Sequence, residues 1–287
     1  MDLFLQQIFN GLTLGSVYIL VAIGLTLVFG ILHIPNFAHG SLYLIGGYIT
    51  LMVMRATGFH YFIAIIASIL VVALIGVLME RLVFHPLRNS PPIHDNIAAI
   101  GMVLFFEALV QLIWGTEFHR MLTPFDSNIS LAGISTTSQR LLVIAVTAIV
   151  VVLLMLFLKK TMTGASILAM AQSREGAFLV GINANKVAMM TFAISGALAA
   201  IAASLASPIN LVFPAMGHLV ILKAFVVVII GGMGSIPGAI VAGLILGMTE
   251  SIGATYISND YKDMIAFLLL IIIMTARPKG LFAKGVY

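Results

Sequence analysis

The sequence predicts an all-α fold, a polytopic bundle of transmembrane helices, and three observations support this prediction. Of the 287 residues, 61% are hydrophobic and only 8% are charged, whereas a soluble domain holds roughly 45–50% apolar and about 25% charged residues. The mean hydropathy is +1.17, and long apolar runs recur along the whole chain. A water-soluble fold needs a polar shell that so few charges cannot supply, so lipid is the solvent that fits.

Eight apolar runs approach or reach the length of about 20 helical residues that crosses a hydrocarbon core. In chain order they cover residues 10–32, 41–54, 61–80, 97–114, 140–158, 187–207, 236–254 and 263–276. A ninth run, 217–232, is short and ends at Gly231-Gly232-Met233-Gly234, where a helix is expected to break. This run fits either a full span or a re-entrant segment buried by protein. The chain therefore has 8–9 predicted membrane segments.

Lysine and arginine in the loops orient these spans, because positive charge gathers on the cytoplasmic side. With nine crossings and a cytoplasmic C-terminus, the inner side holds nine such residues and the outer side holds four. The inner set is Arg81, Arg88, Lys159, Lys160, Arg174, Lys186, Arg277, Lys279 and Lys284, and the outer set is Arg55, Arg120, Arg140 and Lys262. We therefore expect the N-terminus outside and the C-terminus in the cytoplasm. An eight-span chain would place both ends on one side.

The sequence argues against several function classes. It has no cysteine, which excludes disulfides, thiolate metal sites and a cysteine nucleophile. It has no Gly-x4-Gly-Lys-Ser/Thr phosphate loop and no catalytic constellation. The net charge of +4 is spread over short loops without interleaved aromatic residues, which argues against nucleic acid as a partner. We expect no cofactor and no metal. Because the phosphate loop is missing, another chain must hydrolyse the ATP if this protein is part of a pump.

Lys223, Glu107 and Glu250 are charged residues inside predicted spans. A charge at mid-bilayer costs about 2.5–3.5 kcal/mol on insertion scales, so it usually faces a partner or a wet cavity. Lys223 and Glu107 fall at comparable heights and could pair, and Glu250 is a second possible partner for Lys223. Two interpretations stay open, a structural ion pair that fixes helix register and a place along a conduction path.

Three further residues are candidates for such a path. Asn36 follows Pro35 in the segment 33–40, which is predicted to form a structured elbow at the cytoplasmic mouth, because proline ends the helix and asparagine favours a turn. Gly231 and Gly232 mark the expected break after the short ninth run.

Small residues recur at four-residue spacing in the pairs Gly11/Gly15, Gly234/Gly238 and Gly243/Gly247. The run 193–206 is almost entirely alanine, serine and glycine. Small faces let helix backbones approach closely in lipid. The pattern fits ordinary tight packing or helices that slide or line a path.

The segment 173–182, Ser-Arg-Glu-Gly-Ala-Phe-Leu-Val-Gly-Ile, is charged at its start, apolar in its middle and closed by Gly181. This order predicts a short amphipathic helix that stops at the glycine. Such a helix outside the bilayer suits docking into a partner's groove or lying on lipid headgroups.

The same segment carries a family resemblance. Glu175-Gly176-Ala177 with Gly181 resembles the Glu-Ala-Ala-x3-Gly coupling loop of ABC-importer permeases, and in particular of the branched-chain amino acid (LivH-type) permeases of the bacterial inner membrane. Similar segments run almost end to end and include 10–16, 34–40, Glu80-Arg81 with Pro86-Leu87-Arg88, 180–183, 222–228, 231–239 and 277–282. Gly176 departs from the alanine of the pattern, and 160–167 lacks the arginines expected before the coupling helix.

The resemblance implies one permease domain over 1–287, with a cytoplasmic coupling loop at about 159–186 in which Arg174, Glu175, Gly176, Ala177 and Gly181 contact an ATPase. It implies a second homologous permease, two cytoplasmic ATPase subunits and a periplasmic or lipid-anchored substrate-binding protein as partners, besides membrane lipid. The chain would conduct a small, branched-chain or hydrophobic amino acid by alternating access and would not be an enzyme itself. Urea, short amides or aromatic acids are alternative cargoes, and an ion-coupled secondary transporter is the alternative function.

Overall fold

The computed structural model describes residues 2–32, 35–58, 60–88, 90–131 and 134–282. His33 and Ile34 of the predicted elbow and Lys284 of the inner charge set lie outside the described residues. Each predicted apolar run forms a helix. The long helices are α1 (Asp2–Leu32), α2 (His39–Ala56), α3 (Tyr61–Met79), α5 (Pro92–Trp114), α6 (Ser138–Lys160), α9 (Ala184–Ala206), α10 (Met216–Gly231), α11 (Ile236–Tyr256) and α12 (Lys262–Ala276).

Several helices of the bundle are long and apolar enough to cross a membrane, as expected of a polytopic protein. Within the described residues, six helices are long and apolar enough to cross a membrane, namely α1, α3, α5, α6, α9 and α11. The other three are shorter, with 18 residues in α2, 16 in α10 and 15 in α12.

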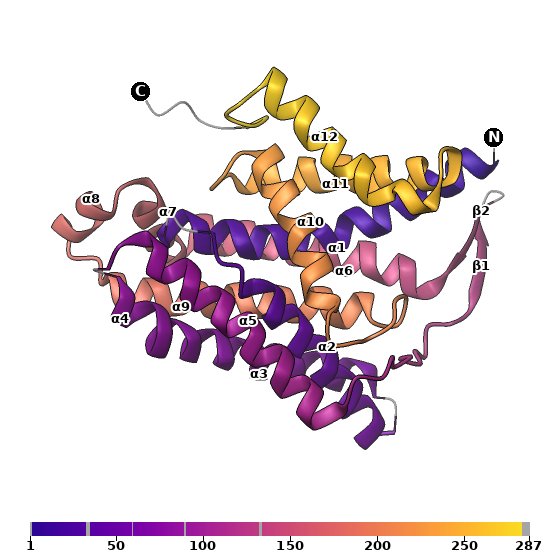
Figure 1. The fold of residues 1–287 in the computed structure, drawn as a ribbon, viewed down its shortest axis with the longest axis horizontal. Coiled ribbons are helices and arrows are strands. Elements are labelled where there is room, and N and C mark those ends of the chain that lie inside the picture. The colour runs from indigo at the N-terminus through magenta and orange to yellow at the C-terminus, as the bar shows by residue number, and fades with distance from the viewer. Residues whose placement is uncertain (1, 33–34, 59, 89, 132–133, 283–287) are drawn as a thin grey trace.

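Short elements occupy the two ends of the bundle (Figure 1). One end holds η1 (Glu80–Phe84, a π-helical turn), α4 (His85–Leu87), α7 (Met162–Gln172) and α8 (Arg174–Leu179). The opposite end holds β1 (Asn128–Leu131) and β2 (Ile134–Thr137) near the start of α1, with the 3-10 helix η2 (Asn259–Tyr261) between α11 and α12. We call these the α8 end and the hairpin end.

The expectation of an all-α fold is wrong in one loop. β1 and β2 pair antiparallel, with Asn128 opposite Thr137 and Leu131 opposite Ile134. An isoleucine in each strand and two threonines in β2 favour extended backbone, but each strand is too short to show a period in a chain dominated by apolar helices.

Helix α1 runs through the middle of the bundle (Figure 1). Its apolar window is 78% buried, against 17% for α5. Glycines on α1 and α11 meet with their backbones in contact, so that a Cβ on Gly15 would lie 2.9 Å from the carbonyl oxygen of Gly243, and one on Gly11 would lie 2.7 Å from the Cα of Met248. The small-residue spacing of these two helices is therefore a packing device, because only glycine permits this approach.

The alanine-rich helix α9 packs against α3 in the same way. A Cβ on Gly76 would lie 2.5 Å from the carbonyl oxygen of Phe192, and one on Gly196 would lie 2.7 Å from that of Val72. Ala199, Ala200 and neighbouring small residues of α9 are fully buried. Large apolar side chains instead cover the outside of α3, α5, α6 and α12, as expected of helices that face lipid or a partner.

Several polar side chains inside the bundle are hydrogen-bonded to one another or to backbone. The Nε2 of Gln139 donates to the Tyr61 hydroxyl at 2.9 Å and to the Leu205 carbonyl oxygen at 3.0 Å, while its Oε1 accepts from Thr123 at 2.9 Å. At the predicted elbow, the Oδ1 of buried Asn36 accepts the backbone N–H of Ala38 at 3.1 Å. This is the local turn that the sequence predicted, and it leads directly into α2.

Candidate functional site

A cavity of about 660 Å³ lies among α1, α6, α10, α11 and α12 and reaches toward the hairpin end, where Gln7, Asn10 and Arg140 line it. This volume falls within the roughly 300–1,000 Å³ of small-molecule sites. We call it the charged cavity, because Arg140, Lys223, Glu250, Lys262 and Asp263 line it. Its apolar lining residues include Leu14, Val17, Ile209, Leu219 and Val220.

Lys223 is the centre of an ion-pair cluster in this cavity. Its Nζ contacts the Oε1 of Glu250 and lies 2.8 Å from the Oδ1 of Asp263. The Tyr18 hydroxyl donates to the other carboxylate oxygen of Glu250 at 2.6 Å. The side chains of Lys223 and Glu250 are only 10% and 4% exposed, whereas that of Asp263 is 56% exposed. Each carboxylate oxygen of Glu250 therefore has a partner. Asp263 lines the cavity with a carboxylate that is more than half exposed.

The sequence predicted part of this cluster. Of the two possible partners of Lys223, Glu250 forms the ion pair and Glu107 does not. Glu107 instead lies 2.8 Å from the Nε2 of His218. His218 and Lys223 are five residues apart on α10, which places them on different sides of a helix with 3.6 residues per turn. The sequence did not indicate Asp263 as a partner, because a charged residue at the start of an apolar run is typical of a loop at the membrane boundary.

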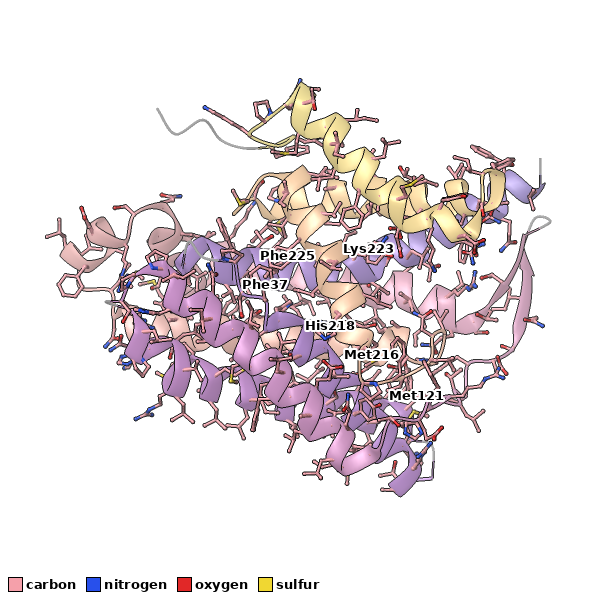
Figure 2. The ribbon with its side chains drawn as sticks, in the orientation of Figure 1. Phe37, Met121, Met216, His218, Lys223 and Phe225 are labelled. Atoms are coloured by element: carbon pink, nitrogen blue, oxygen red, sulfur yellow. The ribbon has the colours of Figure 1, made fainter. Side chains whose placement is uncertain are left out.

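A second, apolar cavity of about 270 Å³ lies between α2, α5 and α10. Phe37, Leu44, Leu104 and Ile221 line it, and the Glu107–His218 pair borders it. Figure 2 shows His218 and Lys223 at different levels of α10, with Phe225 further along the same helix and Phe37 beside it. The two ring centroids are 4.9 Å apart. Helix α10 thus separates an apolar surface from the charged cavity.

Gly231, Gly232 and Asn36 line neither of these two cavities. Gly232 ends α10 with a φ of +97°, which L side chains rarely adopt. The Leu281 N–H donates to the Ile230 carbonyl oxygen at 2.8 Å, and the Phe282 N–H donates to that of Gly231 at 3.1 Å. The two glycines thus break the helix as predicted and let the segment after α12 dock on its end.

The predicted amphipathic helix is α8, at the opposite end of the bundle (Figure 1). The Ser173 hydroxyl caps it by accepting the Gly176 N–H at 3.0 Å, and Gly181 follows its end with a φ of +80°. Ala177 is buried, whereas Arg174 and Glu175 are exposed. Phe178, Leu179 and Val180 are 73%, 86% and 75% exposed, so the helix presents an apolar tip.

A family model described as "Branched-chain amino acid transport system / permease component" matches residues 7–274. The chain belongs to this permease family. The family that the coupling-loop motif indicated is thereby confirmed, and the chain is a transport subunit.

Named relatives resemble this permease over nearly its whole length. It is 36% identical to the Escherichia coli K12 "High-affinity branched-chain amino acid transport system permease protein LivH", over 98% of this chain and 96% of the relative. It is 38% identical to the Pseudomonas aeruginosa permease protein BraD over the same shares. A chain of the solved structure "PsaBC from Streptococcus pneumoniae in complex with Fab" shares the fold, with a TM-score of 0.51 and 13% identity over 96% of the permease and 92% of that chain.

Proposed function

We propose that this permease is the membrane-spanning subunit of an ATP-driven importer that carries a branched-chain or other small hydrophobic amino acid by alternating access. The observation that carries the proposal is the family match over residues 7–274. The LivH and BraD relatives, both named as branched-chain amino acid permeases, supply the substrate class. The charged cavity suits such a substrate, because it combines cationic side chains and the half-exposed Asp263 carboxylate with apolar walls.

The partners follow from the same family. One permease domain, 1–287, would pair with a second related permease, two cytoplasmic ATPases and a periplasmic or lipid-anchored binding protein. The absence of a phosphate loop from the sequence supports ATP hydrolysis in a separate chain. The exposed apolar tip of α8 suits an ATPase groove better than a headgroup surface, because Arg174 is the only lysine or arginine in this six-residue helix.

We propose nine crossings of the bacterial cytoplasmic membrane, with α10 as a short span and with the hairpin end outside. Arg81 lies in η1, Arg88 follows α4, and Lys159 and Lys160 end α6 just before α7. Since η1, α4 and α7 gather at the α8 end, these charges support a cytoplasmic position for that end and for the C-terminus. Since the chain has no cysteine, cysteines placed singly at Met233 and Ser258 report sidedness. A membrane-impermeant maleimide should label Ser258→Cys from outside and Met233→Cys only in inverted vesicles, and the reverse pattern would refute this topology.

The function is tested in proteoliposomes that hold the complete complex, with radiolabelled leucine and the binding protein outside and ATP inside. We expect uptake that requires ATP and persists when the proton gradient is collapsed, and an ATPase variant that cannot hydrolyse ATP is the control. Uptake by this chain alone that follows the proton gradient would make it a secondary transporter. ATP-dependent uptake of urea, a short amide or an aromatic acid in place of leucine would correct the substrate.

A further inference from the structure

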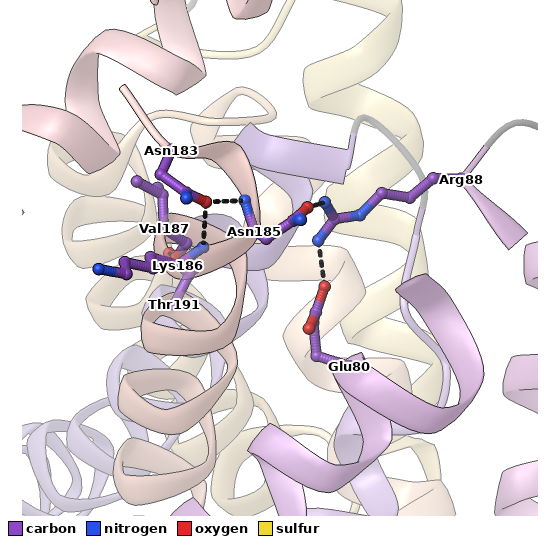
Figure 3. Close-up of polar contacts among 7 residues, drawn as sticks. All are labelled: Glu80, Arg88, Asn183, Asn185, Lys186, Val187 and Thr191. Atoms are coloured by element: carbon purple, nitrogen blue, oxygen red, sulfur yellow. Dashed lines mark hydrogen bonds and ion pairs between the residues drawn. The ribbon is translucent and has the colours of Figure 1, made fainter. Parts of the chain in front are cut away.

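The segments Glu80-Arg81 and Pro86-Leu87-Arg88 carry a buried ion pair that the proposed function leaves without a role. The Nη2 of Arg88 contacts the Oε1 of Glu80 at the α8 end of the bundle (Figure 3). The two side chains are 11% and 1% exposed. Glu80 opens the π-helical turn η1 that follows α3, and such turns are frequent at functional sites. A carboxylate this deeply buried depends on its partner, because no other side chain among the described residues compensates its lost hydration.

Arg88 holds a second element with its other terminal nitrogen. Its Nη1 donates to the Oδ1 of Asn185 at 2.6 Å. The Oε2 of Glu80 has no hydrogen-bond partner among the described residues, so Arg88 is the group that joins this carboxylate to another segment. The planar guanidinium directs its donors along fixed directions, and one arginine can therefore clamp two acceptors from different helices.

Asn185 is joined to α8 by a short series of hydrogen bonds. The Oδ1 of Asn183, the N-cap of α9, accepts the backbone N–H groups of Asn185 and Lys186, both at 3.1 Å (Figure 3). The N–H of Ile182 donates to the Ala177 carbonyl oxygen at 3.0 Å, across the glycine that ends α8. The end of α8 and the start of α9 therefore form one hydrogen-bonded corner.

We propose that Arg88 is a positioning residue that transmits a displacement of α8 to α3 and α5. One arm holds the α8–α9 corner through Asn185, and the other holds the end of α3 through Glu80. Arg88 itself lies just before α5, which begins at Pro92 and lines the apolar cavity with α2 and α10. A displacement of α8 is thus transmitted by the Arg88 guanidinium to α3 and to α5, of which α5 lines the apolar cavity. This inference rests on the proposed function, in which an ATPase docks on α8.

Asn185→Ala is the sharpest test, because it cuts the arm to α9 and leaves the buried Glu80–Arg88 pair intact. In the complete reconstituted complex, we expect the amount of leucine moved per ATP hydrolysed to fall by about fivefold or more, the lower end of the factors by which coupled sites influence each other. Assembly and basal ATP hydrolysis should remain as in the wild type. Asn185→Asp should restore the ratio, since its carboxylate still accepts from Arg88.

Two arginine variants complete the test. Arg88→Lys keeps the positive charge but loses the two terminal nitrogens that hold Glu80 and Asn185 together. It should therefore lower the amount of leucine moved per ATP hydrolysed while the complex still assembles. Arg81→Gln is the matched control, because Arg81 is exposed and makes no ion pair or side-chain hydrogen bond among the described residues. An unchanged ratio in both Asn185→Ala and Arg88→Lys would overturn the proposal while the importer function stands. A wild-type complex without ATP-dependent uptake would instead refute the proposed function.

Discussion

Replacing Lys223 with methionine removes the ammonium group that two carboxylates share inside the charged cavity. Methionine keeps the length and apolar stem of the side chain, so packing on α10 changes little. Glu250 loses its only cationic partner among the described residues and keeps the hydrogen bond from the Tyr18 hydroxyl at 2.6 Å. Asp263 loses a contact of 2.8 Å but remains 56% exposed. The perturbation therefore acts almost entirely on one buried carboxylate.

The expected cost follows from these exposures. Removing one partner of a buried ion pair typically costs about 3–5 kcal/mol, because an uncompensated charge remains. This range applies to Glu250, whose side chain is 4% exposed. For the exposed Asp263, solvent screening limits the loss to about 1 kcal/mol or less. We expect Lys223→Met to lower the free energy of unfolding by roughly 3–5 kcal/mol and to lower or abolish uptake.

Unfolding by sodium dodecyl sulfate in mixed micelles, followed by circular dichroism, measures this difference. Lys262→Met is the control, because Lys262 lines the same cavity but is exposed and makes no ion pair among the described residues. Adding Glu250→Gln to Lys223→Met should recover about 2 kcal/mol or more, since a neutral pair leaves no buried charge. A single variant that costs less than about 1 kcal/mol, or a double variant no better than the single one, would refute this reasoning.

Three other perturbations test the remaining features. Glu175→Lys or Gly181→Leu should uncouple ATP hydrolysis from leucine uptake while the complex still inserts, and normal substrate-stimulated hydrolysis in both would remove α8 from the coupling role. Gly247→Leu should lower the unfolding free energy by about 3 kcal/mol, the upper end of the usual cost of overpacking, because its Cβ would overlap the backbone of α1. Gly101→Leu is the matched control and should change little, because a Cβ at Gly101 would meet no atom of another element within 4 Å. Gln139→Leu should cost about 1–3 kcal/mol in the same unfolding measurement, since it leaves buried partners unsatisfied, and a cost near zero would show that water replaces them.

Several elements could be predicted from the sequence because their causes are local. Apolar runs of sufficient length form helices wherever they occur in lipid, and all nine predicted runs are helical among the described residues. The stop of α8 at Gly181 and the turn at Asn36 depend on the conformational preferences of single residues. The permease family followed from motifs that adjoin these elements, such as the coupling loop at 175–181.

The hairpin and the partners of the charged residues could not be predicted in this way. Helical segments that are apolar on every side give no signal of their rotation, so the sequence could not show that Lys223 faces α11 and α12 while Glu107 faces His218. The role of Asp263 depended on where α12 packs against α10.

The sequence by itself determined that the chain folds in lipid, where its helices lie and to which family it belongs, and it predicted the direction of the chain in the membrane. Composition, run length, motifs and loop charge are properties of the chain alone. The tertiary structure decided which residues meet. Glycines on α1 and α11 bring two backbones into contact, and glycines on α3 and α9 do the same. Side chains far apart in sequence then form the charged cavity at one end and the Glu80–Arg88–Asn185 contact at the other.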